Sequence, residues 1–443
     1  MNKLRQSVIS MIVIGLSGCD LGDRFQSHSS NNSPDMVTSM NRDLDLSVGE
    51  QPGPDLAPSD GSVVQPPDLQ GHVGPPVLNG QKEDLVLGEP DFVTKAQNSQ
   101  TGTNGQWMAN PVGVASDGTH LWVGDGGLIR LMQWNAAPTT NGQTMDVVIG
   151  PSTFTDFSIG PTQNYFAALT PIYVWVSGST IFATDSGANR IMIWNAIPST
   201  NGPPANLVLG QVDYVSNGAG KAATQLDSPQ GLWSDGSHLI VADSNNSRVL
   251  IWNTMPTTKG QAADVVIGRA AFGIGNGDPI ANPPTASTMN KPFDVFFDGA
   301  SNQLFVADSG NNRIMVWNGI PTTNGAPASY VIGQSSVSGS AADAGGAISA
   351  SGYDNPIAVL AAVGSLFVSD FNNHRVLVYT PVPTAAGRPA DAVLGQNDFV
   401  TGTSAQSAND LQINGPRKMA VLGHKLFVAD VAWARVLRWD LSL

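Results

Sequence analysis

The sequence has little cysteine and little charge. Its single cysteine, Cys19, cannot form a disulfide within the chain. Charged residues make up 13% of the 443 residues, and the formal net charge is −14. Nucleic-acid binding needs clustered Lys and Arg to neutralise phosphates, so we expect no nucleic-acid partner. Gly (48) and Pro (30) are abundant, which is typical of short strands joined by turns rather than of helical bundles.

The apolar run near the N-terminus is too short to span a bilayer. It extends from Val8 to Leu16 and follows two basic residues, the pattern of a signal peptide. The next residues, Leu16-Ser17-Gly18-Cys19, resemble the lipobox of bacterial lipoproteins. The resemblance implies that residues 1–18 are removed and that acylated Cys19 anchors the protein to a membrane of the cell envelope, cytoplasmic or outer. The alternative is an ordinary secretory signal that ends in a chance cysteine.

Residues 19–80 lack any sustained helical or strand periodicity. They are rich in Ser, Asn, Asp and Pro, and residues 20–80 hold nine acidic side chains against two basic ones. Such a segment buries too little apolar surface to offset the entropy lost on ordering. We therefore predict an acidic, disordered tether between the lipid and a domain over residues 81–443.

That domain is a repeat array. A short apolar segment that ends in Gly recurs every 58 to 65 residues. Its six copies are Asp84–Gly88, Asp146–Gly150, Asn206–Gly210, Asp264–Gly268, Ser329–Gly333 and Asp391–Gly395. Between them, an Asp is followed five residues later by Arg and four further on by an aromatic residue. The six sets are Asp125/Arg130/Trp134, Asp185/Arg190/Trp194, Asp243/Arg248/Trp252, Asp308/Arg313/Trp317, Asp370/Arg375/Tyr379 and Asp430/Arg435/Trp439.

Each repeat contains four short runs rich in Val, Ile, Phe and Trp, separated by turn residues. Four antiparallel strands repeated radially make the blades of a β-propeller. The segment 304–317, LFVADSGNNRIMVW, resembles the signature of NHL repeats. We predict an all-β, six-bladed propeller of four-stranded blades. The last repeat lacks its outermost strand, so we expect the N-terminal strand 84–88 to complete blade six.

Since every blade carries the Asp and Arg of the framework, these pairs are expected to hold the turn between the second and third strands rather than to mark a site. The segments from each outer strand to the next inner strand are long, with 19 to 24 residues from Gly to Pro. Loops of this length are uncommon unless functional. By topology they share one face, the top face, with the turns between second and third strands.

Six-bladed relatives include lactonases, paraoxonases, strictosidine-synthase-like proteins and amidating lyases. The resemblance implies, for an enzyme, metal-binding Glu, Asn, Asp or His at the channel mouth. This sequence departs from that pattern, because its propeller holds two glutamates, Glu83 and Glu89, and no inner-strand histidine. His120 and His238 are expected in surface turns on the opposite face. We predict no catalytic residues, no metal and no cofactor, and keep a metal-dependent hydrolase or lyase as the alternative.

The channel lining carries one departure from the repeat. Two residues after the Pro that opens each inner strand, three blades have Gly or Ala, whereas Tyr173, Asp294 and Lys418 occupy the other three. These are alternate blades, so the side chains should point inward at one level. With Arg417 beside Lys418, they are a candidate site for a small polar ligand. The alternative is a hydrated channel whose polar lining satisfies itself.

The top-face turns of three adjacent blades are more apolar than the others. We name Leu128, Ile129, Phe371, His374 and Trp433 as a candidate interaction patch, with burial under the long loops as the equal alternative. We therefore predict a monomeric, envelope-anchored binding propeller that presents its top face to a protein, a glycan or a small polar ligand.

Overall fold

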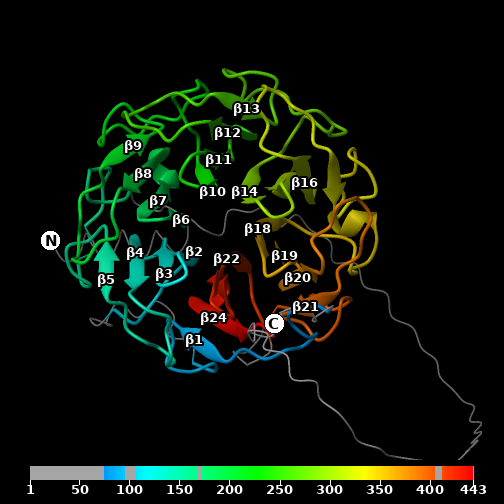
Figure 1. The fold of residues 1–443 in the computed structure, drawn as a ribbon, viewed down its shortest axis with the longest axis horizontal. Coiled ribbons are helices and arrows are strands. Elements are labelled where there is room, and N and C mark those ends of the chain that lie inside the picture. The colour runs from blue at the N-terminus through cyan, green and yellow to red at the C-terminus, as the bar shows by residue number, and fades with distance from the viewer. Residues whose placement is uncertain (1–73, 95–104, 157, 168–170, 405–411, 443) are drawn as a thin grey trace, which may run out of the picture. The chain divides into compact units, whose positions relative to one another are not determined.

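The computed structural model describes residues 74–94, 105–156, 158–167, 171–404 and 412–442. Cys19, the signal peptide and most of the predicted tether lie outside these residues. The described chain forms six four-stranded antiparallel sheets around a common centre (Figure 1). It contains short 3-10 turns but no α-helix, and none of its helical segments meets the length and hydropathy of a membrane span. The predicted six-bladed propeller is confirmed.

Each blade runs from the channel outward. Blade one consists of β2 (Pro111–Ser116), β3 (Leu121–Asp125), β4 (Arg130–Trp134) and β5 (Val147–Ile149), and blade two of β6 (Val174–Ser177), β7 (Thr180–Asp185), β8 (Arg190–Trp194) and β9 (Leu207–Leu209). Blade three consists of β10 (Pro229–Ser234), β11 (Leu239–Asp243), β12 (Arg248–Trp252) and β13 (Val265–Ile267), and blade four of β14 (Pro292–Asp298), β15 (Gln303–Asp308), β16 (Arg313–Asn318) and β17 (Tyr330–Ile332). Blade five consists of β18 (Pro356–Ala362), β19 (Ser365–Asp370), β20 (Arg375–Tyr379) and β21 (Ala392–Leu394), and blade six of β22 (Pro416–Leu422), β23 (Lys425–Asp430), β24 (Arg435–Asp440) and β1 (Leu85–Leu87).

The N-terminal strand closes the ring. Strand β1 pairs with β24 in antiparallel register, with Leu85 opposite Arg438 and Leu87 opposite Val436. Pairing the first and last strands in one blade protects edges that would otherwise be open to other chains. The predicted closure is therefore confirmed.

Closure begins earlier in the chain than residue 81. Val77 is fully buried, and the Asn79 Oδ1 accepts the backbone N–H of Val393 in blade five at 2.9 Å. The Trp439 indole donates to the carbonyl of Gln81 at 3.0 Å. Residues 76–80 read Pro-Val-Leu-Asn-Gly, a sixth copy of the Pro-to-Gly step that follows the aromatic residue in the other five repeats. Residues 76–80 thus contact the propeller, although they lie N-terminal to the expected start of the domain at residue 81.

The Asp and Arg framework holds the top face. In blades two to six, the Arg Nε lies 2.7–2.8 Å from the Asp Oδ2, with both side chains buried. In blade one, the corresponding distance from Arg130 to Asp125 is 4.0 Å. The Arg termini reach further and donate to loop carbonyls, as Arg435 does to Phe92 at 3.0 Å. The pairs thus bracket the turns as predicted and also tie the long loops to the blades.

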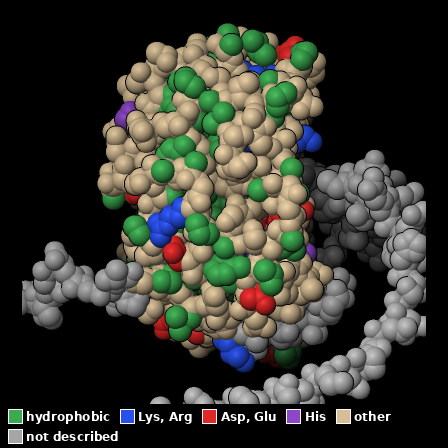
Figure 2. All heavy atoms as spheres, turned by 90° about the vertical axis from the view of Figure 1, so that its right-hand side faces the viewer, with side chains coloured by type: hydrophobic (Ala, Val, Ile, Leu, Met, Phe, Trp, Pro, Cys, Tyr) green, Lys and Arg blue, Asp and Glu red, His purple; other side chains and the backbone are tan. Residues whose placement is uncertain are grey.

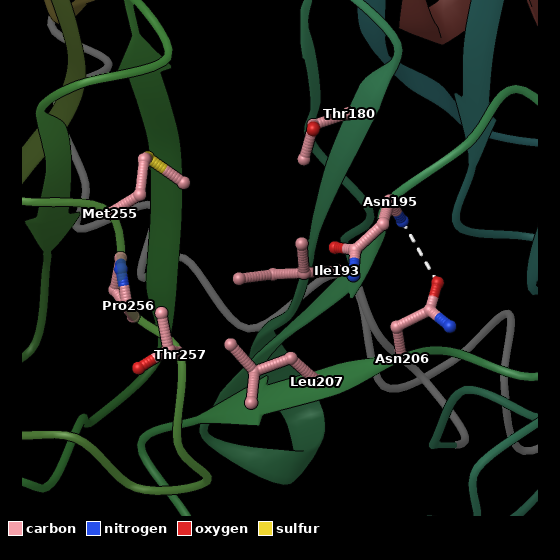
Figure 3. A pocket seen from close by; sticks show the side chains of 8 residues that line it. All are labelled: Thr180, Ile193, Asn195, Asn206, Leu207, Met255, Pro256 and Thr257. Carbon is pink, nitrogen blue, oxygen red and sulfur yellow. Dashed lines mark hydrogen bonds between the residues drawn. The ribbon is translucent and has the colours of Figure 1, made fainter.

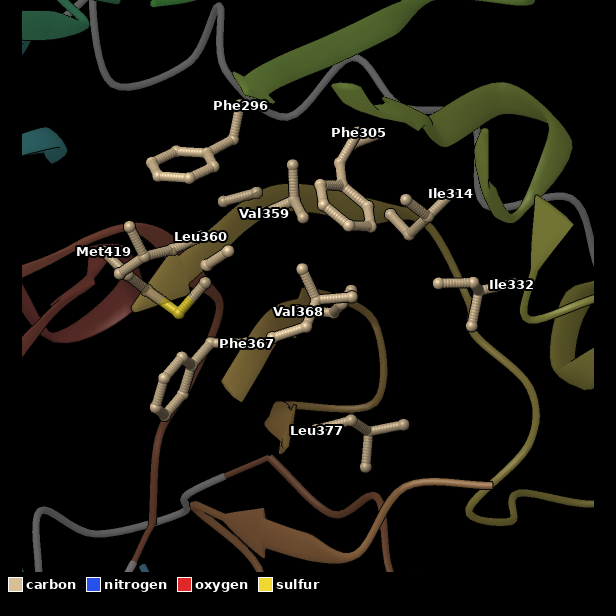
Figure 4. Packing of buried hydrophobic residues seen from close by; sticks show 14 of the residues in the cluster. Phe296, Phe305, Ile314, Ile332, Val359, Leu360, Phe367, Val368, Leu377 and Met419 are labelled. Carbon is tan, nitrogen blue, oxygen red and sulfur yellow. The ribbon is translucent and has the colours of Figure 1, made fainter. Parts of the chain in front are cut away.

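Apolar side chains fill the space between neighbouring sheets. Figure 4 shows part of one cluster, in which Phe305 of blade four packs with Val359, Phe367 and Val368 of blade five. All four are buried. Because each blade shares its core with two neighbours, the ring is stabilised as a unit rather than blade by blade.

Candidate functional site

The residues two positions after the Pro that opens each inner segment are equivalent in the six repeats, although Tyr173 lies just before β6. They are Gly113, Tyr173, Gly231, Asp294, Ala358 and Lys418. Inner strands surround the centre of the ring in Figure 1, so side chains of alternate blades can meet there. We call Tyr173, Asp294, Arg417 and Lys418 the entrance cluster.

Asp294 and Lys418 form a buried ion pair across the channel. The Lys418 Nζ lies 2.5 Å from the Asp294 Oδ1, and the two side chains are 2% and 0% exposed. The other carboxylate oxygen accepts the backbone N–H of Val359 at 3.1 Å. Burial raises the pKa of the Asp294 carboxyl above its usual value, although Lys418 opposes this. The pair joins blades four and six, and its carboxylate also contacts blade five.

Gly231 leaves the room for this carboxylate. A Cβ at Gly231 would lie 2.0 Å from the Asp294 Oδ1 and 2.8 Å from the Asp294 Cα. Any larger residue at position 231 would therefore displace the ion pair. Gly231 is one of the three small residues at this position of the repeat, and the structure adds this specific requirement.

Arg417 and Tyr173 form the second contact across the channel. The Arg417 NH1 donates to the Tyr173 hydroxyl at 3.0 Å, joining blades six and two. The guanidinium lies 5.1 Å from the centre of the Phe371 ring, a cation–π distance. Its Nε is buried and has no hydrogen-bond acceptor within the described chain. Burial raises the pKa of Tyr173, which keeps its phenol protonated.

An aromatic layer borders the ion pair. The Lys418 Nζ lies 5.8 Å from the centre of the Trp175 ring. That ring packs against Trp233 at 6.5 Å and edge-on against Phe296 at 5.8 Å. Low-polarity walls strengthen electrostatic interactions within the channel. These aromatics are not among the predicted site residues, although each lies four residues after the Pro that opens its inner segment, in three successive blades.

The structure thus brings the four predicted channel residues together in two pairs, Asp294 with Lys418 and Arg417 with Tyr173. Ligand binding by them remains a prediction. The second candidate set, the interaction patch, is not an exposed apolar surface. Trp433 and Ile129 are 6% and 8% exposed, and Leu128, Phe371 and His374 are partly buried. These five residues therefore fit the alternative, burial by neighbouring segments, better than they fit an exposed interaction patch.

The histidines lie apart from one another. His120 and His238 contact Asp117 and Asp235 of their own turns at 2.8 and 3.0 Å, as expected for surface turns. Burial lowers the pKa of His374. No three His, Cys, Asp or Glu side chains of the described residues are arranged to hold a metal ion. The metal-dependent alternative therefore has no ligand set in this part of the chain.

Two views of the surface away from the channel show mostly uncharged side chains. A groove of about 300 Å³ between blades two and three is lined by uncharged side chains, among them Ile193, Leu207 and Met255 (Figure 3). Figure 2 shows one side of the molecule, where charged side chains are few and scattered among neutral ones. Neither view adds an ionisable cluster comparable to that at the channel entrance.

Comparisons with known proteins give only distant likeness. No family model and no curated protein matches the chain. Among solved structures, the chain is similar to a streptogramin B lyase with 13% identity and a TM-score of 0.40, over 76% of this chain and 94% of that chain. A virginiamycin B lyase from Staphylococcus aureus shares 14% identity with a TM-score of 0.36, over 75% of this chain and 95% of the other. A structure of a nidogen/laminin complex shares 16% identity with a TM-score of 0.35, over 61% and 76%. Scores this low carry no argument about the site, so the six-bladed fold rests on the strand pairing of this chain itself.

Proposed function

We propose that this chain is a binding propeller that takes a small polar ligand at the entrance cluster. The observation that carries the proposal is the buried Asp294 and Lys418 pair. Removing two charges from water costs free energy that their attraction often fails to recover, so apolar residues would serve stability as well. Three blades do place Gly or Ala at this level. A role in ligand binding accounts for the charges of Asp294 and Lys418 at a position where other blades fold without a charged residue.

A protein or glycan partner on the top face is the second candidate. Three long loops repeat the pattern Asp-aromatic-Val-Ser/Thr, and in each the Asp Oδ1 accepts two backbone N–H groups at 2.6–3.0 Å. These turns hold three valines outward, Val93, Val215 and Val400, which are 69%, 65% and 69% exposed. Rigid exposed apolar side chains favour contact with a partner.

The same proposal places the propeller in the cell envelope as a lipid-anchored NHL-like protein. Its support is the sequence at Leu16–Cys19 and the NHL-like segment 304–317. Replacing Cys19→Ser should release the protein into the soluble envelope fraction or leave an uncleaved precursor. Unchanged processing and unchanged detergent partition of this variant would contradict anchoring at Cys19.

The binding proposal is tested by retention from an envelope extract. The immobilised full chain is incubated with the extract, and retained small molecules, glycans and proteins are identified by mass spectrometry. We expect a small molecule that the Arg417→Gln variant no longer retains. A variant of a partly exposed arginine of blade five, Arg388→Gln, should still retain it. A partner lost only on changing the three exposed valines to Ser would favour the second candidate. Equal retention by every variant would contradict both, and turnover of a retained compound would favour the enzyme alternative.

A further inference from the structure

Of the charged side chains at the channel entrance, Arg417 has no partner of opposite charge. The Lys418 Nζ and the Asp294 Oδ1 neutralise each other at 2.5 Å. Within the described chain, no carboxylate lies within ion-pair distance of Arg417, whereas the framework arginines of five blades each hold an aspartate at 2.7–2.8 Å. The entrance cluster therefore carries one excess positive charge.

We infer that the ligand of the entrance cluster is a small anion that binds Arg417 through a single carboxylate. This inference rests on the proposed function and names the class of its ligand. One excess positive charge matches one negative charge, which favours a monocarboxylate over a phosphate dianion. The planar guanidinium also presents paired N–H donors in the geometry that a carboxylate accepts.

Arg417 is held in place before a ligand arrives. The Phe371 ring lies against its guanidinium, and the Tyr173 hydroxyl accepts from NH1. Its backbone carbonyl accepts the Ser369 hydroxyl at 2.7 Å. Arg417 as a whole is nevertheless only partly buried. A group fixed in its binding conformation loses less entropy when the ligand binds.

The buried Nε gives a second reason to expect an acceptor. A buried donor without an acceptor costs free energy, and Nε of Arg417 is in this position within the described chain. A carboxylate that accepts the Nε–H would offset this cost with a charge-assisted hydrogen bond. A neutral amide of the same shape supplies one oxygen and no charge, so it should bind more weakly.

The test uses benzoate as the carboxylate probe, benzamide as its neutral counterpart and inorganic phosphate as the competing anion. Binding to the full chain is measured by calorimetry at constant ionic strength, together with the NMR signals of arginine Nε–H groups. We expect benzoate to bind about ten-fold more tightly than benzamide or phosphate, as one charged hydrogen bond implies. The same titration should shift the Arg417 Nε–H signal to saturation.

Variants separate the site from general ion binding. Arg417→Gln should abolish the preference for benzoate, Arg417→Lys should keep part of it, and Arg388→Gln should leave it unchanged. Equal binding of benzoate and benzamide through Arg417 would overturn the carboxylate inference and leave the proposed polar-ligand site standing. Tighter binding of phosphate would overturn it in the same way. If no probe binds through Arg417 and the extract yields no Arg417-dependent compound, the site itself is refuted.

Discussion

Lys418 and Asp294 are bonded at 2.5 Å although 124 positions separate them in sequence and blade five lies between their blades. Arg417, the neighbour of Lys418, reaches Tyr173 of blade two in the same way. Two consecutive residues of β22 thus connect the alternate blades two, four and six across the channel. Strand β22 belongs to blade six, in which the last strand, β24, pairs with the first strand, β1.

The ion pair should matter little for stability as long as both charges leave together. Asp294→Ala alone leaves a buried ammonium and should lower the free energy of unfolding by about 3–5 kcal/mol. The double variant Asp294→Ala, Lys418→Met should lie within about 1 kcal/mol of the parent. Urea unfolding of the three proteins checks this. A double variant as unstable as the single one would assign the pair a structural role.

Gly231 should tolerate no side chain. An Ala Cβ there meets the Asp294 carboxylate at 2.0 Å, so Gly231→Ala should destabilise the protein by about 1–3 kcal/mol through overpacking. Gly299→Ala is the matched control, because a Cβ at Gly299 meets nothing within 4 Å. Thermal unfolding compares the two variants. Equal melting temperatures would show that the channel accommodates the extra methyl group by moving.

The segment from Pro76 to Gly88 should be needed by the whole ring. It contributes Val77, Leu85, Val86 and Leu87, all at most 1% exposed. Removing residues 1–88 should therefore lower the free energy of unfolding by more than about 3 kcal/mol. Removal of residues 1–73 is the control and should leave the unfolding midpoint unchanged. A protein without residues 1–88 that melts with the parent would argue against closure by this strand.

Tyr353 should serve as the partner of Tyr379. Their hydroxyls lie 2.5 Å apart and are buried, in the blade that has Tyr in place of the framework Trp. Tyr353→Phe leaves the Tyr379 hydroxyl without this partner and should cost about 1–3 kcal/mol. The double variant Tyr353→Phe, Tyr379→Phe should recover most of that loss. A double-mutant cycle from denaturant unfolding measures the coupling, and simple additivity would contradict it.

Asp84 should make the pairing of β1 with β24 sensitive to acid. Burial opposes ionisation of its carboxyl, but hydrogen bonds from Arg438 and Lys425 outweigh burial and lower its pKa from the ordinary 3.8. A folded-state pKa below the unfolded one adds stability above pH 3.8, and this is lost as the pH falls through the folded value. Asp84→Asn should therefore cost under about 1 kcal/mol near neutral pH, since the pair is partly exposed.

The pH dependence of unfolding distinguishes the specific effect of the Asp84 charge from a general loss of charge. Measured by urea unfolding, the difference between the parent and Asp84→Asn should shrink as the pH falls below 3.8. A difference that stays constant across this range would show that Arg438 and Lys425 do not stabilise the folded state through the Asp84 charge.

Much of the fold was readable in the sequence because a propeller repeats its constraints. The short β-rich runs and the Asp-to-Arg spacing indicated four strands in each blade, and the missing strand after Trp439 indicated closure by Asp84–Gly88. The sequence pattern alone does not distinguish the copy at Pro76–Gly80 from the tether-like composition beside it. Only its contacts with Val393 and Ser442 identify it as part of the ring.

The sequence by itself determined which positions of the channel depart from the repeat, because equivalent residues can be aligned without coordinates. Tyr173, Asp294 and Lys418 were identified in this way. Tertiary structure alone decided that Lys418 pairs with Asp294 and Arg417 with Tyr173, because these contacts depend on side-chain reach across the channel. It also decided that Trp433 and Ile129 are buried. Burial depends on how neighbouring blades and loops pack over a turn, and no local pattern of residues encodes that packing.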